Sequence, residues 1–248
     1  MLPANTRVKL MDAYTFKARW SPALIAFAPL SLAALSWLAG DQEIWKEWGG
    51  VIVTTGLGAL LVNFARERGK KLEPELFSLW GGKPTCLALR HTSSCPEQAT
   101  RWRDLLEEET GLKLPNVEEE ALDMAAADRN YDVAVKKLIS TRRDRKKYPL
   151  IFTENCNYGF WRNLIGLKPI GILLTILGIA LSGIPTYLKI IQEWEGFVSG
   201  DLSAIGLSVF ALIVNLLMLI FWVFFARKAC VKHAADAYAA RLLESLED

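Results

Sequence analysis

A run of positive charge at residues 142–147 is the feature of this sequence most able to bind a ligand. Five of the six residues in Arg142-Arg143-Asp144-Arg145-Lys146-Lys147 are cationic, and they repel one another unless anions lie near. Phosphate groups are the expected counterparts, either in anionic lipid headgroups or in a nucleotide or oligonucleotide. A solvated helix end is the third interpretation.

Other basic residues could extend this surface, and aromatic residues near them could stack on bases. The predicted oligonucleotide-binding set is Arg142, Arg143, Arg145, Lys146, Lys147, Lys83, Arg90, Arg101, Arg103 and Arg162. The candidate stacking residues are Trp80, Trp102, Phe152 and Tyr158.

A second candidate site is the amide of Asn215, which interrupts the most apolar stretch of the chain. An amide in hydrocarbon is costly unless it faces a partner helix or water, so it either bonds between helices or lines a pore. The predicted pore-lining set is Asn215, Ser208, Ala211, Met218, Leu219, Trp222, Thr54, Thr55 and Asn63. No predicted span has a charged residue in its interior, which argues against an ion-coupled transporter but permits a pore gated by dewetting.

The tract 155–163, Asn-Cys-Asn-Tyr-Gly-Phe-Trp-Arg-Asn, predicts a turn, because three asparagines and a glycine favour one. It leads into an apolar segment, so it is either a structural lead-in anchored by aromatics or an elbow that couples a soluble domain to a gate. The candidate gate-coupling residues are Asn155, Asn157, Tyr158 and Gly159.

Enzyme signatures are weak. The spacing Cys86-x4-His91-x3-Cys95 is not a standard zinc pattern. Residues 81–85, Gly-Gly-Lys-Pro-Thr, lack the phosphate-loop spacing and predict a turn. We therefore expect a protein that is not an enzyme and has no cofactor or metal.

Four apolar segments must position these residues. A helix of about 20 apolar residues crosses a bilayer, and the segments lie at 20–39, 50–65, 166–188 and 204–226. The sequence thus predicts a mainly α, polytopic membrane protein, with four transmembrane helices as two hairpins flanking a mostly helical cytoplasmic domain. The expected parts are an N-terminal segment (1–19), hairpin 1 (20–65), a ligand-sensing domain (66–165), hairpin 2 (166–226) and a C-terminal helix (227–248).

Basic residues flank the cytoplasmic ends of spans, and here they cluster around residues 7–19, 66–71, 162–168 and 227–232. This pattern predicts a protein of the bacterial inner membrane whose termini and central domain lie on the cytoplasmic side. The domain itself is acidic in the middle, because residues 104–132 have ten acidic and two basic side chains.

Within the domain, helices are expected at 97–110 and 117–140, the second with an Asn116–Glu119 capping box. Residues 148–153 predict a short strand or an extended lead-in. The tail is expected to continue the fourth span as a helix. Its apolar stripe must pack either on the same chain or on another subunit, and is formed by Val231, Ala235, Tyr238, Leu242 and Leu246.

Several tracts together suggest a family. They are Asp12–Arg19, Lys71–Pro74 with Gly81–Pro84, and Asn155–Asn163 followed by Gly166–Pro169. In these tracts and in its organisation the chain resembles the membrane half of the Hailong anti-phage defence system. The resemblance implies a homo-tetrameric ion channel in contact with membrane lipids and a partner nucleotidyltransferase that makes single-stranded DNA oligomers. Those oligomers would keep the channel shut, and their loss would open it and depolarise the cell.

The leading functional hypothesis is therefore a ligand-gated channel of bacterial immunity. Two alternatives remain: a membrane scaffold that recruits a soluble partner through the acidic zone 104–132, and a channel that a nucleotide messenger opens.

Overall fold

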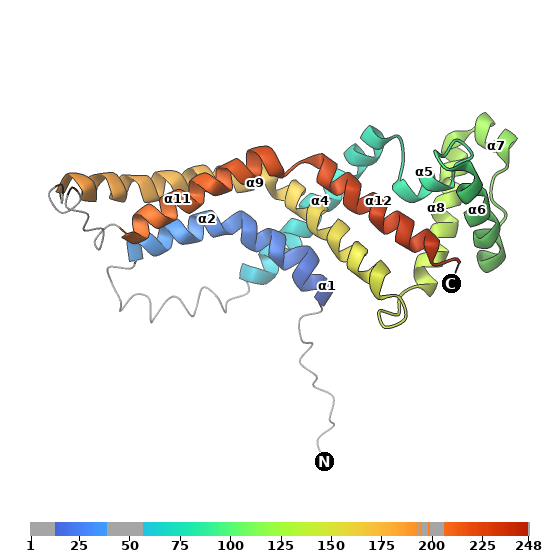
Figure 1. Ribbon diagram of the computed structural model, residues 1–248, viewed down its shortest axis with the longest axis horizontal. Helices are drawn as coiled ribbons and strands as arrows, with labels where there is room; N and C mark the ends of the chain where they lie inside the picture. The colour runs from blue at the N-terminus through green and yellow to red at the C-terminus, as the bar shows by residue number, and fades with distance from the viewer. Residues whose placement is uncertain (1–12, 39–56, 193, 195–197, 199–205, 248) are drawn as a thin grey trace, which may run out of the picture. The chain divides into compact units, whose positions relative to one another are not determined.

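The computed structural model describes residues 13–38, 57–192, 194, 198 and 206–247. Within these ranges the regular structure is entirely helical (Figure 1). The elements are α1 (Ala13–Thr15), the π-helical turn η1 (Phe16–Trp20), α2 (Ser21–Leu38), α4 (Leu57–Trp80), α5 (Pro84–Leu89), α6 (Pro96–Thr110), α7 (Val117–Leu122), α8 (Met124–Thr141), α9 (Pro149–Gln192), α11 (Gly206–Ile220), the π-helical turn η2 (Phe221–Phe225) and α12 (Lys228–Glu244).

The chain forms two compact units. Unit 1 comprises residues 1–71 and 162–227, and unit 2 comprises residues 72–161 and 228–248. Helices α4 and α9 each begin in one unit and end in the other.

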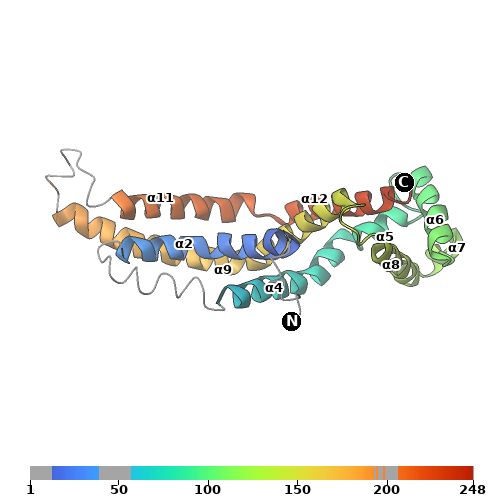
Figure 2. The same ribbon diagram turned by 90° about the horizontal axis from the view of Figure 1, so that it is seen from below.

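Unit 1 contains the apolar helices. In Figures 1 and 2, α2, α11 and the second half of α9 run side by side. Among the described residues, three stretches are long and apolar enough to cross a membrane, namely Phe16–Ser36, Pro149–Gln192 and Gly206–Phe225. The chain is therefore membrane-associated. Residues 50–56 of the predicted span 50–65 lie outside the described residues, and residues 57–65 form the start of α4, so the prediction of four spans stays a prediction.

Many large apolar side chains lie on the outer surface of unit 1, and its interior holds several polar side chains together with alanines. Leu173, Ile176 and Ile184 of α9 and Phe210 and Leu217 of α11 are exposed, whereas serine, threonine and asparagine side chains are buried. This arrangement is the reverse of that in a water-soluble protein, and it suits a lipid environment. Lipid tails solvate the exposed apolar side chains, whereas polar groups need partners inside the bundle.

Unit 2 has a conventional hydrophobic core that α12 completes. Leu242 and Leu243 of α12 are fully buried beside Leu106 and Leu138, and Tyr238 and Leu246 pack against the same cluster. The tail stripe thus packs on its own chain, which was one of the two alternatives. Its helix does not continue the preceding span, because Ala226 (φ −75°, ψ 86°) breaks it after η2.

Three local predictions are wrong. The tract 155–163 is not a turn and residues 148–153 are not a strand, because α9 runs unbroken through residues 149–192. Ile151, Cys156 and Leu164 of this stretch are buried at helical spacing, and this packing overrides local propensity. The helix expected at 117–140 is two helices, because Asp123 leaves helical geometry and caps α8 by accepting from the Ala126 N–H.

Two other local predictions are confirmed. The Asn116–Glu119 capping box is formed at α7. Gly81 (φ +79°) and Gly82 (φ +152°) make the expected turn with positive φ angles, a conformation that favours glycine.

Candidate functional site

The first candidate site is a seam inside unit 1, defined here as the facing small and polar residues of α9 and α11. Helical spacing puts Ser208, Ala211 and Asn215 of α11 and Trp222 of η2 on one side, and all four are buried. On α9, Gly171 faces Trp222 and Gly178 faces Asn215, and Thr175, Ser182 and Thr186 at helical spacing from them are buried.

The hydroxyl groups of α9 are satisfied within the helix. Thr175 Oγ1 donates to the Gly171 carbonyl at 2.6 Å, Ser182 Oγ to the Gly178 carbonyl at 2.6 Å, and Thr186 Oγ1 to the Ser182 carbonyl at 2.8 Å. Back-bonding of this kind is usual for serine and threonine in helices. Each of these hydroxyl oxygens still has a lone pair that can accept a hydrogen bond.

Three helices meet at Gly178. A Cβ atom there would lie 2.9 Å from the carbonyl oxygen of Pro29 in α2 and 3.0 Å from Asn215 Nδ2 in α11. A Cβ atom at Gly171 would likewise clash with the indole ring of Trp222. The two glycines thus allow the close helix approach that small residues permit in membranes.

Asn215 is the unusual member of the seam. Its side chain is 0% exposed, yet neither its Nδ2 nor its Oδ1 atom has a hydrogen-bond partner among the described residues. The indole nitrogen of Trp222 is also buried without a hydrogen-bond partner among the described residues. Each such buried group costs about 1–3 kcal/mol, so the bundle in this conformation holds polar groups that water or another arrangement of the helices would satisfy.

The other predicted pore-lining residues are placed differently. Met218 and Leu219 are half-buried, and Asn63 is exposed on α4. Thr54 and Thr55 lie outside the described residues.

We expect Gly178→Ala to destabilise unit 1 by about 1–3 kcal/mol, because a new methyl group must displace backbone or the Asn215 amide. Thermal unfolding of the detergent-solubilised chain measures this. Gly183→Ala on the same helix is the matched control, because its Cβ would meet only Leu212 Cδ1 at 3.8 Å. Equal unfolding temperatures for the two variants would show that the seam is not tightly packed at Gly178.

The second candidate site is the predicted set of ten basic residues, and five of them have structural partners within the fold. Lys83 pairs with Asp132 at 2.6 Å. Arg90 donates to both carboxylate oxygens of Asp128, at 2.9 and 2.5 Å. Burial raises the pKa of Asp132, but hydrogen bonds from Lys136 and Lys83 outweigh it and lower that pKa overall.

Three further arginines are held by neighbouring groups. Arg142 pairs with Glu109 at 2.6 Å and also donates to Ser245. Arg103 is buried and donates to the Leu89 carbonyl at 2.6 Å. Arg162 is buried in unit 1 beside Asn163. These arginines therefore secure the fold, and the ten predicted residues do not form one surface.

Residues 143–147, called here the basic loop, connect α8 to α9. Arg143, Arg145, Lys146 and Lys147 are all exposed. The Arg145 guanidinium lies 4.6 Å from the ring centre of Phe152, and Lys147 Nζ lies 5.1 Å from that of Tyr148. A cavity of about 230 Å³ adjoins the loop, lined by Lys147, Tyr148 and Arg241 among others. The side chain of Arg101 is 66% exposed, and its Nε atom lies 3.6 Å from Oε1 of Glu247.

The predicted gate-coupling residues lie within α9. Tyr158 stacks parallel on Tyr238 of α12, with ring centres 6.5 Å apart, and its hydroxyl donates to Glu73 of α4 at 3.0 Å. Asn157 donates to Glu154, Asn155 is half-buried and Gly159 is buried. Tyr158 therefore joins three helices of unit 2, a role that sequence reasoning missed because Glu73 and Tyr238 are distant along the chain.

The cysteine and histidine residues weighed as a zinc site do not converge. Cys86 donates to the Asp128 carbonyl at 3.6 Å, and burial raises the pKa of its thiol to about 11. The His91 ring contacts the Pro115 carbonyl at 3.1 Å. Within the described part of the chain, no three histidine, cysteine, aspartate or glutamate side chains come together as a metal site.

No protein family, curated protein or solved structure matches this chain.

Proposed function

We propose that the protein is a ligand-gated ion channel whose water path follows the seam between α9 and α11. The observation that carries the proposal is the fully buried Asn215 amide without a partner among the described residues. Water entering between the helices would hydrate this amide and the adjacent Trp222 N–H. The packed seam is then the closed state, and the polar groups lower the free energy of the hydrated, open state.

The ligand is a phosphate-rich polymer that binds the basic loop. Clustered exposed cations bind phosphodiester backbones with strong salt dependence, and Phe152 and Tyr158 lie on the helix that follows the loop. A short single-stranded DNA oligomer fits this chemistry. Bound ligand shifts the gating equilibrium only through different affinities for the closed and open states.

The route from ligand to gate is proposed to run along the chain itself. The basic loop immediately precedes α9, and the same helix has Tyr158 near its start and Gly178 in the seam. Helix α12, on which Tyr158 stacks, follows η2 after only Ala226 and Arg227.

The remaining features of the proposal come from the resemblance and the charge pattern. They are a homo-tetramer in the bacterial inner membrane with its termini and unit 2 in the cytoplasm, a partner nucleotidyltransferase that supplies the oligomer, and depolarisation of the infected cell when the oligomer is lost.

Potassium release from vesicles containing the purified chain tests the proposal. We expect release without ligand and suppression by an added single-stranded oligodeoxynucleotide of mixed sequence. Stimulation by the oligomer would reverse the sign of gating and favour the channel opened by a nucleotide. Absence of release in both conditions, with insertion verified by protease protection, would contradict channel function.

Recruitment of a soluble partner is the second candidate. It is favoured by the exposure of Leu122 (89%) and Val117 (57%) on α7, which lies in the acidic zone. Such isolated apolar side chains on an acidic helix suit a basic, apolar docking segment.

A further inference from the structure

The π-helical turn η2, which ends the apolar segment begun by α11, contains one residue more than a regular helical turn. The Ala226 N–H donates to the Phe221 carbonyl at 3.0 Å, five residues earlier in the chain. A regular α-helix makes this bond over four residues. Such π-bulges are rare and often lie at functional positions of helices.

The turn places Trp222 against α9. The indole ring of Trp222 is fully buried, and a Cβ atom at Gly171 would clash with its Cζ2, Cε2 and Cη2 atoms. The indole N–H has no acceptor among the described residues. A buried polar group without a partner is rare in a stable arrangement, so Trp222 closes the seam beside Gly171 while its own N–H stays unsatisfied.

Lys168 holds the end of the turn. Its Nζ atom donates to the Ala226 carbonyl at 2.8 Å, and Ala226 is the residue whose N–H closes the turn. Lysine side chains near the end of a helix commonly bind its last carbonyls and interact favourably with its dipole. Because Lys168 lies one turn before Gly171 on α9, the same part of α9 contacts both the ring of Trp222 and the end of η2.

A change of η2 to α-helical bonding would alter the position of α11. Release of the extra residue shifts the helix register by one residue, which corresponds to a rotation of about 100° and a translation of about 1.5 Å. Within its bounds, Gly206–Ile220, α11 has no charged side chain, so lipid permits this rotation. The rotation would move Asn215 off Gly178 and Trp222 off Gly171.

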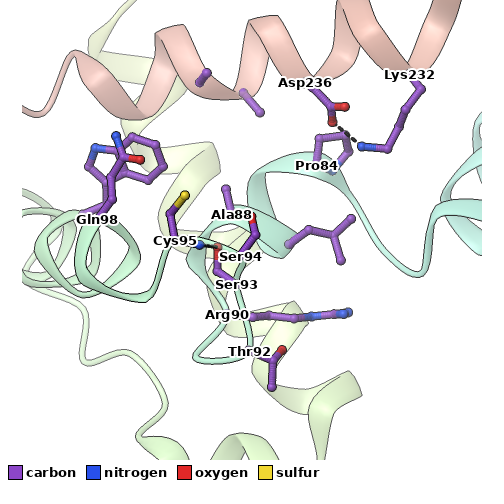
Figure 3. Close-up of a pocket in the computed structure, with 14 residues that line it drawn as sticks. Pro84, Ala88, Arg90, Thr92, Ser93, Ser94, Cys95, Gln98, Lys232 and Asp236 are labelled. Atoms are coloured by element: carbon purple, nitrogen blue, oxygen red, sulfur yellow. Dashed lines mark hydrogen bonds and ion pairs between the residues drawn. The ribbon is translucent and has the colours of Figure 1, made fainter. Parts of the chain in front are cut away.

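The turn also lies where the chain passes from unit 1 to unit 2. Helix α12 begins at Lys228 and belongs to unit 2. There it lines a cavity with the loop that joins α5 to α6, and its Lys232 and Asp236 side chains are bonded to each other (Figure 3). A ligand-dependent change at α12 therefore acts on η2 before it acts on α11.

We propose that η2 is the switch of the channel. In the closed state the turn is π-helical and holds Trp222 against Gly171, and in the open state it becomes α-helical and withdraws the ring from the seam. Lys168 is a positioning residue that stabilises the closed state through Ala226. This inference rests on the proposed channel function, and it adds the element that moves.

Deletion of Val223 tests the proposal, because η2 can then become α-helical without any rotation of α11. Val223 is 48% exposed, and deletion of Ile213, 51% exposed on α11, is the matched control. We expect the Val223 deletion to unfold within about 3 °C of the parent chain in detergent, whereas the Ile213 deletion lowers the unfolding temperature by about 10 °C or more because it turns Ser208 away from the side of Asn215. In vesicles without ligand, the Val223 deletion should lower potassium release at least about tenfold, since the alternative register is lost.

The outcomes separate this inference from the channel function. An equal loss of unfolding temperature in the two deletions would show that η2 has no residue to spare, and a stable Val223 deletion with parental release would show that η2 does not gate. Either result would overturn the proposal. Absence of release from the parent chain would contradict the channel function itself, and the switch would fall with it.

Lys168→Met should act in the opposite direction, because it removes a bond of the closed state. The oligodeoxynucleotide concentration that halves potassium release should rise about tenfold. Lys168→Arg, which can still donate to the Ala226 carbonyl, should return this concentration to within about threefold of the parent value. Lys70→Met, at an exposed position of α4, removes the same charge and should change nothing. An equal rise in both methionine variants, or no recovery in Lys168→Arg, would remove Lys168 from the switch.

Discussion

Reversal of two charges in the basic loop, Arg143→Glu with Lys146→Glu, should weaken binding of a single-stranded oligodeoxynucleotide on the order of 100-fold at about 0.1 M salt. Each reversal removes a phosphate contact and adds repulsion, so the slope of log affinity against log salt should also become shallower by about 1.4 for a single strand. Fluorescence anisotropy of a labelled oligomer over a salt series measures both quantities.

The choice of these residues follows from the structure. Arg142 is left unchanged because its pairing with Glu109 and Ser245 fixes the base of the loop. The matched control is Lys113→Glu with Arg129→Glu, which changes the net charge of the chain equally at two exposed positions of unit 2. An equal loss of affinity in the control would mean that net charge alone drives binding, and an unchanged affinity in the loop variant would remove the loop from the ligand site.

Substitution of the buried amide, Asn215→Leu, should lower potassium release from vesicles at least about tenfold, because the seam loses the group that water would hydrate. The same change should raise the free energy of unfolding of unit 1 by about 1–2 kcal/mol, since a buried amide without a partner is removed and replaced by a side chain of similar volume.

The sign of the stability change separates the two interpretations of Asn215. An amide that bonds between helices would make Asn215→Leu destabilising, whereas an unsatisfied one makes it stabilising. Asn63→Leu on the exposed face of α4 is the control for loss of an amide outside the seam, and it should leave both flux and stability close to those of the parent chain. Unchanged flux in Asn215→Leu would contradict the proposed water path.

The sequence predicted the parts of the fold that depend on local pattern. Hydropathy located the three described apolar helices, and the spacing of Val231, Leu242 and their neighbours identified the buried face of α12. The turn at Gly81 and Gly82 was also predictable, because its backbone geometry favours glycine.

The candidate sites were less predictable because they depend on partners far along the chain. Arg90, Lys83 and Arg142 appeared available in sequence, but their partners Asp128, Asp132 and Glu109 are 38, 49 and 33 residues away. The tract 155–163 was misassigned for the same reason, since distant residues bury one side of it. Residue type therefore identified Asn215, but only packing showed that its amide is buried without a partner.

The most direct test of the central claim is the water accessibility of the seam at Ser208, which lies on the same buried side of α11 as Asn215. In vesicles containing Ser208→Cys, which keeps the Asn215 amide, a small charged thiol reagent should modify position 208 when no oligodeoxynucleotide is present and should fail to do so when the oligomer suppresses flux, with modification followed peptide by peptide. Modification that is absent in both conditions, while potassium release persists, would show that ions follow another path and would contradict the account.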